Sequence, residues 1–508
     1  MHRSKAEDRP IVVTQSGSVR GEWDAGCAVF RGIPYAEPPV GPLRYAAPVP
    51  RAPWEGTIEA VTFGPTPQRL EGGITRIPEH TVPGDDTLSV NVWTPSLDPA
   101  AELPVVVWIH GGGFVSGSPA SPWYDGRAFA RDGVVLVTLS YRLGFKGFGW
   151  IEDAVPNRGV LDWICALEWV QEHIWAFGGD PQKVTIAGQS AGGGAVLTLL
   201  GVPGAVGLFR AGYAMSAAVA DPSVDAARHR SQHLARLASV SDNTAGFSSI
   251  PESRILELQP KITKPAPSHL LHDIHELLRD GLMLGHVADG RIVPDPTAFA
   301  VSTGINAGVP LVLGSTDGEL DGLFAPRHFL DFTPRKVLLR ALGASSSAAT
   351  RWLETPLARG TANTIELLGH YATDAVFHSW IPRVAAARAS CGAGPTWSYR
   401  FRWHSDSPPQ AGHCIDVPFV FDRLDAPGVE AIAGIHPPQR LADEAHGALV
   451  RFACDLDPGW PVDLDGHGPS RIFDVPEPAP EDAYESARAL LGQDRGEVAR
   501  SHDVGDHI

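Results

Sequence analysis

The sequence lacks the long hydrophobic run that a membrane-spanning helix requires. Nowhere in its 508 residues do about 18 apolar residues follow one another, so no membrane partner is expected. The first eight residues are charged and contain no apolar segment, so a secretory signal is not predicted either.

Cysteine is scarce as well. The five cysteines are Cys27, Cys165, Cys391, Cys414 and Cys454. They are odd in number and widely spaced, and none forms the close pair that is typical of zinc sites. We therefore predict that the protein binds no metal and is located in the reducing cytoplasm.

Positive charge is in deficit. The chain has 41 Lys and Arg against 58 Asp and Glu, which gives a net charge of −17. Such a chain repels phosphate backbones, so a nucleic-acid partner is not expected. Hydrophobic residues make up 43% of the sequence, which is an ordinary value for a globular protein.

The chain does contain alternating strand-like and helix-like segments. Residues 104–109 and 134–139 are continuous apolar runs rich in β-branched residues, typical of strands buried on both faces of a parallel sheet. Residues 157–177 have helical spacing and lead to another apolar strand at 183–189. This order predicts an α/β fold with a mostly parallel central sheet and crossover helices.

Other segments depart from this alternation. Residues at about 10–60 are predicted to form an N-terminal β-meander that includes a proline-rich stretch. Residues at about 222–285 and 335–390 are polar and helical, and we predict that they are helical insertions over the active site. No internal repeat divides the sequence, so residues 1–508 are expected to form a single domain.

A nucleophile motif follows the strand at 183–189. Gly188, Ser190 and Gly192 form G-x-S-x-G, the nucleophile elbow, in which a serine is raised on a tight turn between a strand and a helix. The N-terminus of that helix favours negative charge developing near the serine. A glycine-rich turn without function can have the same spacing, so the prediction of Ser190 as nucleophile depends on the rest of the chain.

Residues 110–113, His-Gly-Gly-Gly, come directly after another buried strand. Glycines let backbone N–H groups approach a substrate oxygen without obstruction by side chains. We predict that the N–H groups of Gly112, Gly113 and Ala191 form an oxyanion hole. The alternative is a flexible surface loop, which the preceding strand and the elbow make the weaker interpretation.

These segments together resemble the type-B carboxylesterase family, which includes the bacterial p-nitrobenzyl esterases. The matching residues are 32–36, 38–44, 85–88, 110–114, 141–144, 177–181 and the elbow. The resemblance extends from about residue 10 to about residue 475 and implies the α/β-hydrolase fold. It also implies serine carboxylesterase activity without a cofactor.

The resemblance implies which residues complete a catalytic triad. The family's acid is a glutamate five residues after a glycine, which corresponds here to Glu319 after Gly314. Asp317 and Asp321 are close rivals for this role.

The family's base lies in a segment that corresponds to residues 413–421, so His413 is the predicted base. His404 and His436 are weaker alternatives.

Two positions depart from the family pattern. Thr87 stands where secreted members have a disulfide cysteine, in agreement with a reducing compartment. Residues 216–218 read Ser-Ala-Ala, where many members have Ser-Gly-Ser and use the second serine to support the acid. Support of the acid is therefore in doubt, and Ser216 is equally compatible with a helix cap.

The substrate is expected to be a small or medium uncharged ester, cleaved through an acyl-enzyme. Phe114, Phe324 and Phe419 are predicted to line the pocket. Residues 413–419 also resemble bacterial phenylcarbamate hydrolases, so hydrolysis of aryl carbamates or anilides is the alternative. A non-catalytic adhesion homologue is disfavoured because all three triad residues are kept. The protein is expected to be a monomer or homodimer.

Overall fold

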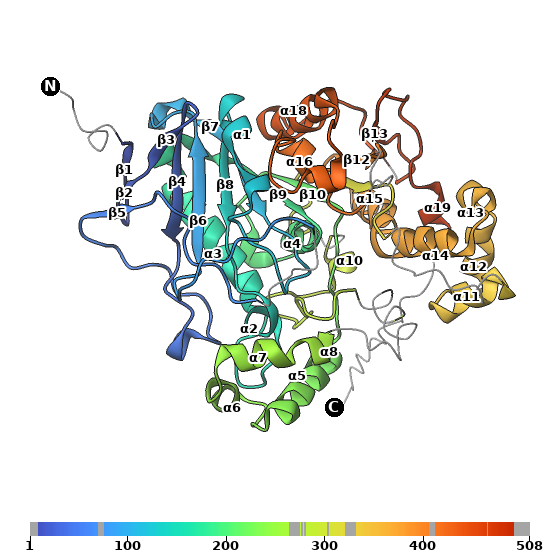
Figure 1. The fold of residues 1–508 in the computed structure, drawn as a ribbon, viewed down its shortest axis with the longest axis horizontal. Coiled ribbons are helices and arrows are strands. Elements are labelled where there is room, and N and C mark those ends of the chain that lie inside the picture. The colour runs from blue at the N-terminus through green and yellow to red at the C-terminus, as the bar shows by residue number, and fades with distance from the viewer. Residues whose placement is uncertain are drawn as a thin grey trace, which may run out of the picture.

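A ten-stranded sheet runs through the molecule, with helices on both of its faces (Figure 1). The computed structural model describes residues 9–69, 76–263, 275, 278, 281–301, 304–320, 332–405, 412–464 and 466–491. The strands of the sheet, in spatial order, are β13 (Arg471–Phe473), β12 (Thr396–Phe401), β11 (Leu311–Thr316), β10 (Ala211–Met215), β9 (Gly179–Gln189), β7 (Leu103–Ile109), β8 (Val135–Leu139), β6 (Ser89–Thr94), β4 (Cys27–Pro34) and β3 (Glu22–Asp24).

The sheet is mostly parallel, as the sequence predicts. Every neighbouring pair from β13 to β8 is parallel, whereas β6, β4 and β3 pair antiparallel at one edge. The carboxyl ends of the parallel strands therefore lie along one edge of the sheet, where ligand sites of open α/β folds form.

The central strand β7 shows why its apolar run is continuous. Val105 and Val107 pack into one hydrophobic core, and Val106 and Trp108 pack into another on the opposite face. Residues alternate between the faces of a strand, so a strand covered on both sides must be apolar throughout. The first core includes α3 (Arg158–His173) and α4 (Ala191–Leu200), and the second includes α1 (Arg127–Arg131), α16 (Val417–Val420) and α18 (Gln439–Asp455).

The N-terminal region differs from the predicted single meander. β1 (Ile11–Thr14), β2 (Gly17–Arg20) and β5 (Thr57–Glu59) form a separate three-stranded sheet, whereas β3 and β4 join the main sheet. β1 alternates between exposed and buried residues, which is the pattern of a strand with one face toward solvent. In contrast, the first four residues of β4 are all buried. Burial on both faces thus directs β4 into the main sheet.

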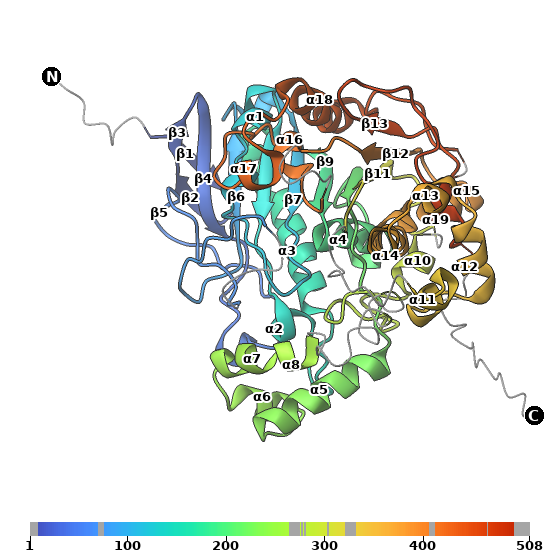
Figure 2. The same ribbon diagram turned by 45° about the vertical axis from the view of Figure 1, so that its right-hand side comes forward.

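Two groups of helices lie within or near the ranges 222–285 and 335–390, where the sequence predicts helices (Figures 1 and 2). The first group contains α5 (Val224–Ala238), α6 (Thr244–Ser248), α7 (Glu252–Leu258) and α8 (Pro260–Thr263). The second contains α11 (Arg335–Ala341), α12 (Ser346–Leu353), α13 (Pro356–Gly360), α14 (Thr364–Thr373), a π-helical turn (Asp374–His378) and α15 (Trp380–Ser390). The Gln259 side chain accepts a 2.9 Å hydrogen bond from the Phe145 N–H in α2 (Gly144–Phe148), which follows β8, so the first group lies beyond the carboxyl end of that strand.

Several short helices complete the fold: α10 (Thr297–Ala300), α17 (Glu430–Ala433) and α19 (Glu485–Arg488). None of the helices in the described ranges is long and apolar enough to cross a membrane. All five cysteines are free thiols.

Candidate active site

The elbow follows strand β9 directly. Ser190 caps α4 in a strained conformation, with φ of +59° and ψ of −123°, and its N–H donates a 2.9 Å hydrogen bond to the carbonyl oxygen of Met215. A Cβ atom on Gly192 would lie 2.0 Å from the carbonyl oxygen of Ile109 in β7. Only glycine fits at that position, so close packing of strand and helix explains why the motif needs it.

The predicted oxyanion residues lie at the ends of neighbouring strands. Gly112 has φ of +108° and Gly113 has φ of +60°, shortly after β7 ends. Among the described residues, their N–H groups have no acceptor within the protein. Ala191 is the first residue of α4, where helical N–H groups are unpaired by nature. The geometry thus leaves main-chain donors available beside the elbow.

Glu319 and His413 meet beyond the ends of β11 and β12. The Nδ1 atom of His413 forms a short hydrogen bond with a carboxylate oxygen of Glu319, and Glu319 is only 4% exposed. The other Glu319 oxygen accepts hydrogen bonds from the Ser216 hydroxyl at 2.6 Å, the Ser315 hydroxyl at 2.5 Å and the Thr316 N–H at 2.8 Å. The carboxylate is thereby held in one orientation.

These contacts determine the charge of the pair. Burial acts to raise the pKa of Glu319, but the charge and hydrogen bond of His413, together with the two serine hydroxyls, lower it to about 2. Burial acts to lower the pKa of His413, but Cys414 and the Glu319 carboxylate raise it well above its ordinary value. A carboxylate that stays ionised and a more basic imidazole suit an acid–base pair.

The second nitrogen of His413 faces the elbow. His413 Nε2 lies 3.3 Å from the side-chain nitrogen of Gln189, the residue before Ser190. Within the described part of the chain no hydrogen bond joins Ser190 to His413; such contacts often tighten only when substrate binds. The ring centroids of Phe377 and His413 lie 4.9 Å apart, with a tilt of 43° between the rings.

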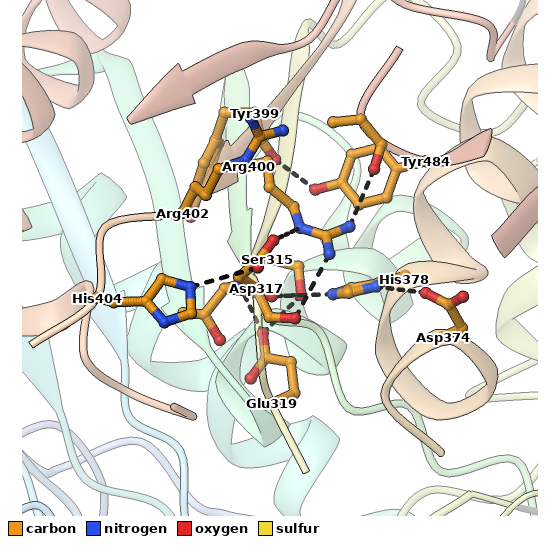
Figure 3. Close-up of polar contacts among 12 residues, drawn as sticks. Ser315, Asp317, Glu319, Asp374, His378, Tyr399, Arg400, Arg402, His404 and Tyr484 are labelled. Carbon is orange, nitrogen blue, oxygen red and sulfur yellow. Dashed lines mark hydrogen bonds and ion pairs between the residues drawn. The ribbon is translucent and has the colours of Figure 1, made fainter. Parts of the chain in front are cut away.

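The rival acids and bases point elsewhere. Asp317 forms an ion pair with Arg400 at 2.8 Å and a longer one with His404 at 3.5 Å, so the rival carboxylate and the rival imidazole pair with each other (Figure 3). Asp416, a further carboxylate that lies only three residues after His413 in the sequence, is fully buried and accepts a 3.3 Å hydrogen bond from the Tyr399 hydroxyl. Burial and the Glu319 charge raise the pKa of Asp416 to about 7.

The two remaining rivals are His436 and Asp321. His436 is exposed at the surface. Asp321 lies outside the described residues.

Two of the predicted pocket residues are core residues instead. Phe114 has no exposed surface and packs against Phe148 and Trp163. Phe419 also has no exposed surface and lies between Phe401 and Trp403. The expectation fails because aromatic residues near a motif fill the core as readily as a pocket.

Phe324, the third predicted pocket residue, lies outside the described residues.

Support for the acid is stronger than the sequence suggests. Ser216, left in doubt as a helix cap, has φ of +44° and donates directly to Glu319, and so does Ser315. Sequence reasoning missed Ser315, Gln189 and Phe377. Only Ser315 had a local signal, since it precedes Glu319 by four residues within the same segment.

The sheet order and the strand–turn–helix elbow define this molecule as an α/β-hydrolase. The family model described as "Carboxylesterase family" matches residues 8–454. The chain therefore belongs to the carboxylesterase family and is a carboxylic ester hydrolase.

Similar proteins are known in sequence and in structure. The chain is 32% identical to the para-nitrobenzyl esterase of Bacillus subtilis (strain 168), over 96% of this chain and 99% of that one. It is 31% identical to the phenmedipham hydrolase of Pseudarthrobacter oxydans, over 98% of each chain. The crystal structure of the Geobacillus stearothermophilus carboxylesterase EST55 superposes with a TM-score of 0.82 at 32% identity, covering 94% of this chain and 99% of that one.

Proposed function

We propose that this enzyme hydrolyses small to medium uncharged esters through an acyl-enzyme on Ser190. The observation that carries the proposal is the hydrogen bond between His413 Nδ1 and the buried Glu319, beside the elbow. With its proton on Nδ1, His413 presents the lone pair of Nε2 toward the elbow. That tautomer is the one that accepts a proton from a serine.

The reaction then follows from the positions of these groups. His413 Nε2 takes the Ser190 proton while Oγ adds to the substrate carbonyl carbon, and Glu319 stabilises the imidazolium. The N–H groups of Gly112, Gly113 and Ala191 bind the oxyanion, and each such donor typically contributes about 3 kcal/mol. The C–O bond breaks, and the alcohol leaves with the proton from His413. Water, activated by the same histidine, then releases the acid.

The net charge of the protein counts against an anionic substrate. A net charge of −17 disfavours the approach of anions. The relative named para-nitrobenzyl esterase is similar over nearly the whole chain.

Hydrolysis of aryl carbamates or anilides by the same triad is the second candidate. It is supported by 31% identity to a phenmedipham hydrolase over 98% of the chain and by residues 413–419. A non-catalytic adhesion role is disfavoured, because Ser190, Glu319 and His413 are all present.

A matched substrate panel tests the two candidates. Phenyl butyrate, phenyl N-methylcarbamate and butyranilide share the aryl group and differ in the bond that is cleaved. We expect kcat/KM to be highest for the ester. A higher value for the carbamate or anilide would establish the second candidate, and no turnover of any of the three would contradict both.

Location and assembly belong to the same proposal. We propose a cytoplasmic protein, supported by five free cysteines. We propose a monomer or homodimer, and light scattering on the purified protein measures which of the two forms.

A further inference from the structure

A second buried histidine–carboxylate pair lies behind the turn that carries Glu319 (Figure 3). His378 and Asp374 are the last and first residues of the π-helical turn between α14 and α15. Their Nδ1 and Oδ1 atoms are 2.7 Å apart, and both side chains are 1% exposed. π-Helical turns are rare and occur frequently at functional sites.

The hydrogen-bond partners of His378 indicate which of its ring nitrogens donates a proton. Nε2 lies 2.9 Å from the carbonyl oxygen of Thr316, which can only accept. Nδ1 faces Asp374, whose other oxygen accepts a 2.8 Å hydrogen bond from the Trp352 indole. Nε2 therefore donates its proton to Thr316, and Nδ1 is hydrogen-bonded to Asp374.

The contacts of Asp374 keep its carboxyl group acidic. Burial acts to raise the pKa of Asp374, but the hydrogen bond and charge of His378, followed by the charge of Arg400 and the hydrogen bond of Trp352, lower it below the ordinary range. The other groups near the pair are Asp317, which pairs with Arg400, and the Tyr484 ring, 5.6 Å from the His378 ring.

Thr316 connects this pair to the acid. Its N–H donates to Glu319 at 2.8 Å, and its carbonyl oxygen accepts from His378. The next residue, Asp317, is held by β12 through its N–H to the Phe401 carbonyl oxygen at 2.9 Å and through Arg400. The turn between β11 and Glu319 is thus held from the π-helical turn on one side and from β12 on the other.

We propose that His378, hydrogen-bonded to Asp374, is a positioning residue for the ester hydrolysis proposed above. Its hydrogen bond fixes the Thr316 carbonyl, and with it the turn from which Glu319 orients His413. The inference rests on the proposed roles of Glu319 and His413. His378 and Asp374 also line a cavity of about 280 Å³.

Three variants separate this role from a structural one. His378→Phe removes the hydrogen bond to the Thr316 carbonyl oxygen, and should lower kcat for p-nitrophenyl butyrate about tenfold with KM within about twofold. In Asp374→Asn, the new amide can donate to Nδ1 and leave a proton on Nε2 for Thr316, so kcat should fall less than about threefold.

His370→Phe is the matched control. His370 lies in α14, and its Nδ1 is 3.2 Å from the Thr361 hydroxyl, away from the acid. This variant should keep the wild-type kcat.

Proton NMR provides a readout that loss of stability alone would not change. The most downfield imidazole N–H signal, from His413 bonded to Glu319, should shift or broaden in His378→Phe and stay unchanged in His370→Phe. Thermal unfolding of each variant shows that the assayed protein is folded. An Asp374→Asn enzyme whose kcat falls about tenfold or more below wild type would overturn the role of the Thr316 hydrogen bond, and this measurement applies even if the Phe variant fails to fold.

Organophosphate labelling distinguishes failure of the positioning role of His378 from failure of the proposed ester hydrolysis. An active wild type labelled on Ser190, with His378→Phe unchanged in kcat and NMR signal, would overturn the positioning role alone. A wild type that is neither active nor labelled would overturn the proposed function and this inference together.

Discussion

On the elbow side of the site Ser190 is held by the main chain, whereas on the acid side Glu319 is held through its own side chain. The elbow packs Gly192 against the Ile109 carbonyl oxygen, and the Ser190 N–H bonds to Met215. None of these contacts uses the serine hydroxyl. The Glu319 carboxylate, in contrast, accepts hydrogen bonds from three protein groups besides His413.

Because of this difference, a substitution at Ser190 should affect activity alone, whereas a substitution at Glu319 should affect both activity and stability. Removing the Ser190 hydroxyl leaves every elbow contact in place. Altering the Glu319 carboxylate removes a charged acceptor from the buried groups that donate hydrogen bonds to it. Weakly paired donors in the protein interior lower the free energy of unfolding. The two sides should therefore respond differently to equally small substitutions.

Ser190→Ala should have the largest effect on activity and almost none on stability. We expect kcat to fall by about 10⁴-fold or more, because the nucleophile is lost. The melting temperature should stay at the wild-type value. Ester assays, labelling by an organophosphate and thermal unfolding measure the three quantities. A marked fall in melting temperature would break the comparison, and activity near wild type would exclude Ser190 as the nucleophile.

Glu319→Gln should lose both activity and stability. Gln keeps the shape but cannot stabilise the imidazolium, so kcat should fall about 10³-fold. The free energy of unfolding should fall by about 1–3 kcal/mol, because the buried donors lose a charged acceptor. Denaturant unfolding and steady-state kinetics on the same preparation measure the two effects.

The rival carboxylates serve as controls for that substitution. Asp317→Asn, Asp321→Asn and Asp416→Asn should each lower kcat less than about tenfold. If one of these substitutions causes the large loss of kcat and Glu319→Gln causes only a small one, the assignment of Glu319 as the acid is wrong. The assignments of Ser190 and His413 do not depend on that result.

The same contrast explains what the sequence could and could not predict. The elbow was predictable because close backbone packing restricts positions 188 and 192 to glycine. The two glycines lie close together in the sequence, so a short local motif reveals them. The apolar runs of β7 and β8 predicted the buried parallel sheet for a similar reason, since a strand covered on both faces has no place for polar residues.

The acid side was less predictable because its contacts join distant segments. Ser216 and Glu319 are 103 positions apart, and His378 and Thr316 are 62 apart. No local pattern indicates such pairs. The aromatic pocket residues failed because Phe114 and Phe419 satisfy the hydrophobic core, and sequence spacing does not distinguish a core ring from a pocket ring.

The pH dependence of activity tests the charge coupling on the acid side. Only neutral His413 accepts the serine proton, so activity should be lost as pH falls through the pKa of His413. Because Glu319 raises that pKa, the acid limb of log kcat/KM should lie above about pH 6.5, the ordinary histidine value, with a tenfold loss per pH unit below it. Glu319→Gln should move the limb to lower pH. A profile that is flat from about pH 5 to 9 would argue against a histidine base.

The smallest effects should come from the two serines that hold the acid. Ser216→Ala and Ser315→Ala each remove one donor from the same Glu319 oxygen and leave two. We expect each single variant to lower kcat about threefold and the double variant more than about tenfold, because donors to one shared atom are not additive.

A matched control distinguishes this loss from a general loss of buried hydroxyls. Ser398 is 1% exposed in β12, and its hydroxyl donates to the Asp463 carboxylate at 3.3 Å, so it has the same chemistry away from the triad. Ser398→Ala should lower the free energy of unfolding by about 1 kcal/mol and leave kcat unchanged. If Ser216→Ala and Ser315→Ala also changed only stability, the hydroxyls would support the fold without orienting Glu319. A loss of kcat confined to these two variants would instead mean that side-chain hydrogen bonds hold Glu319 in its working orientation, as main-chain packing holds Ser190.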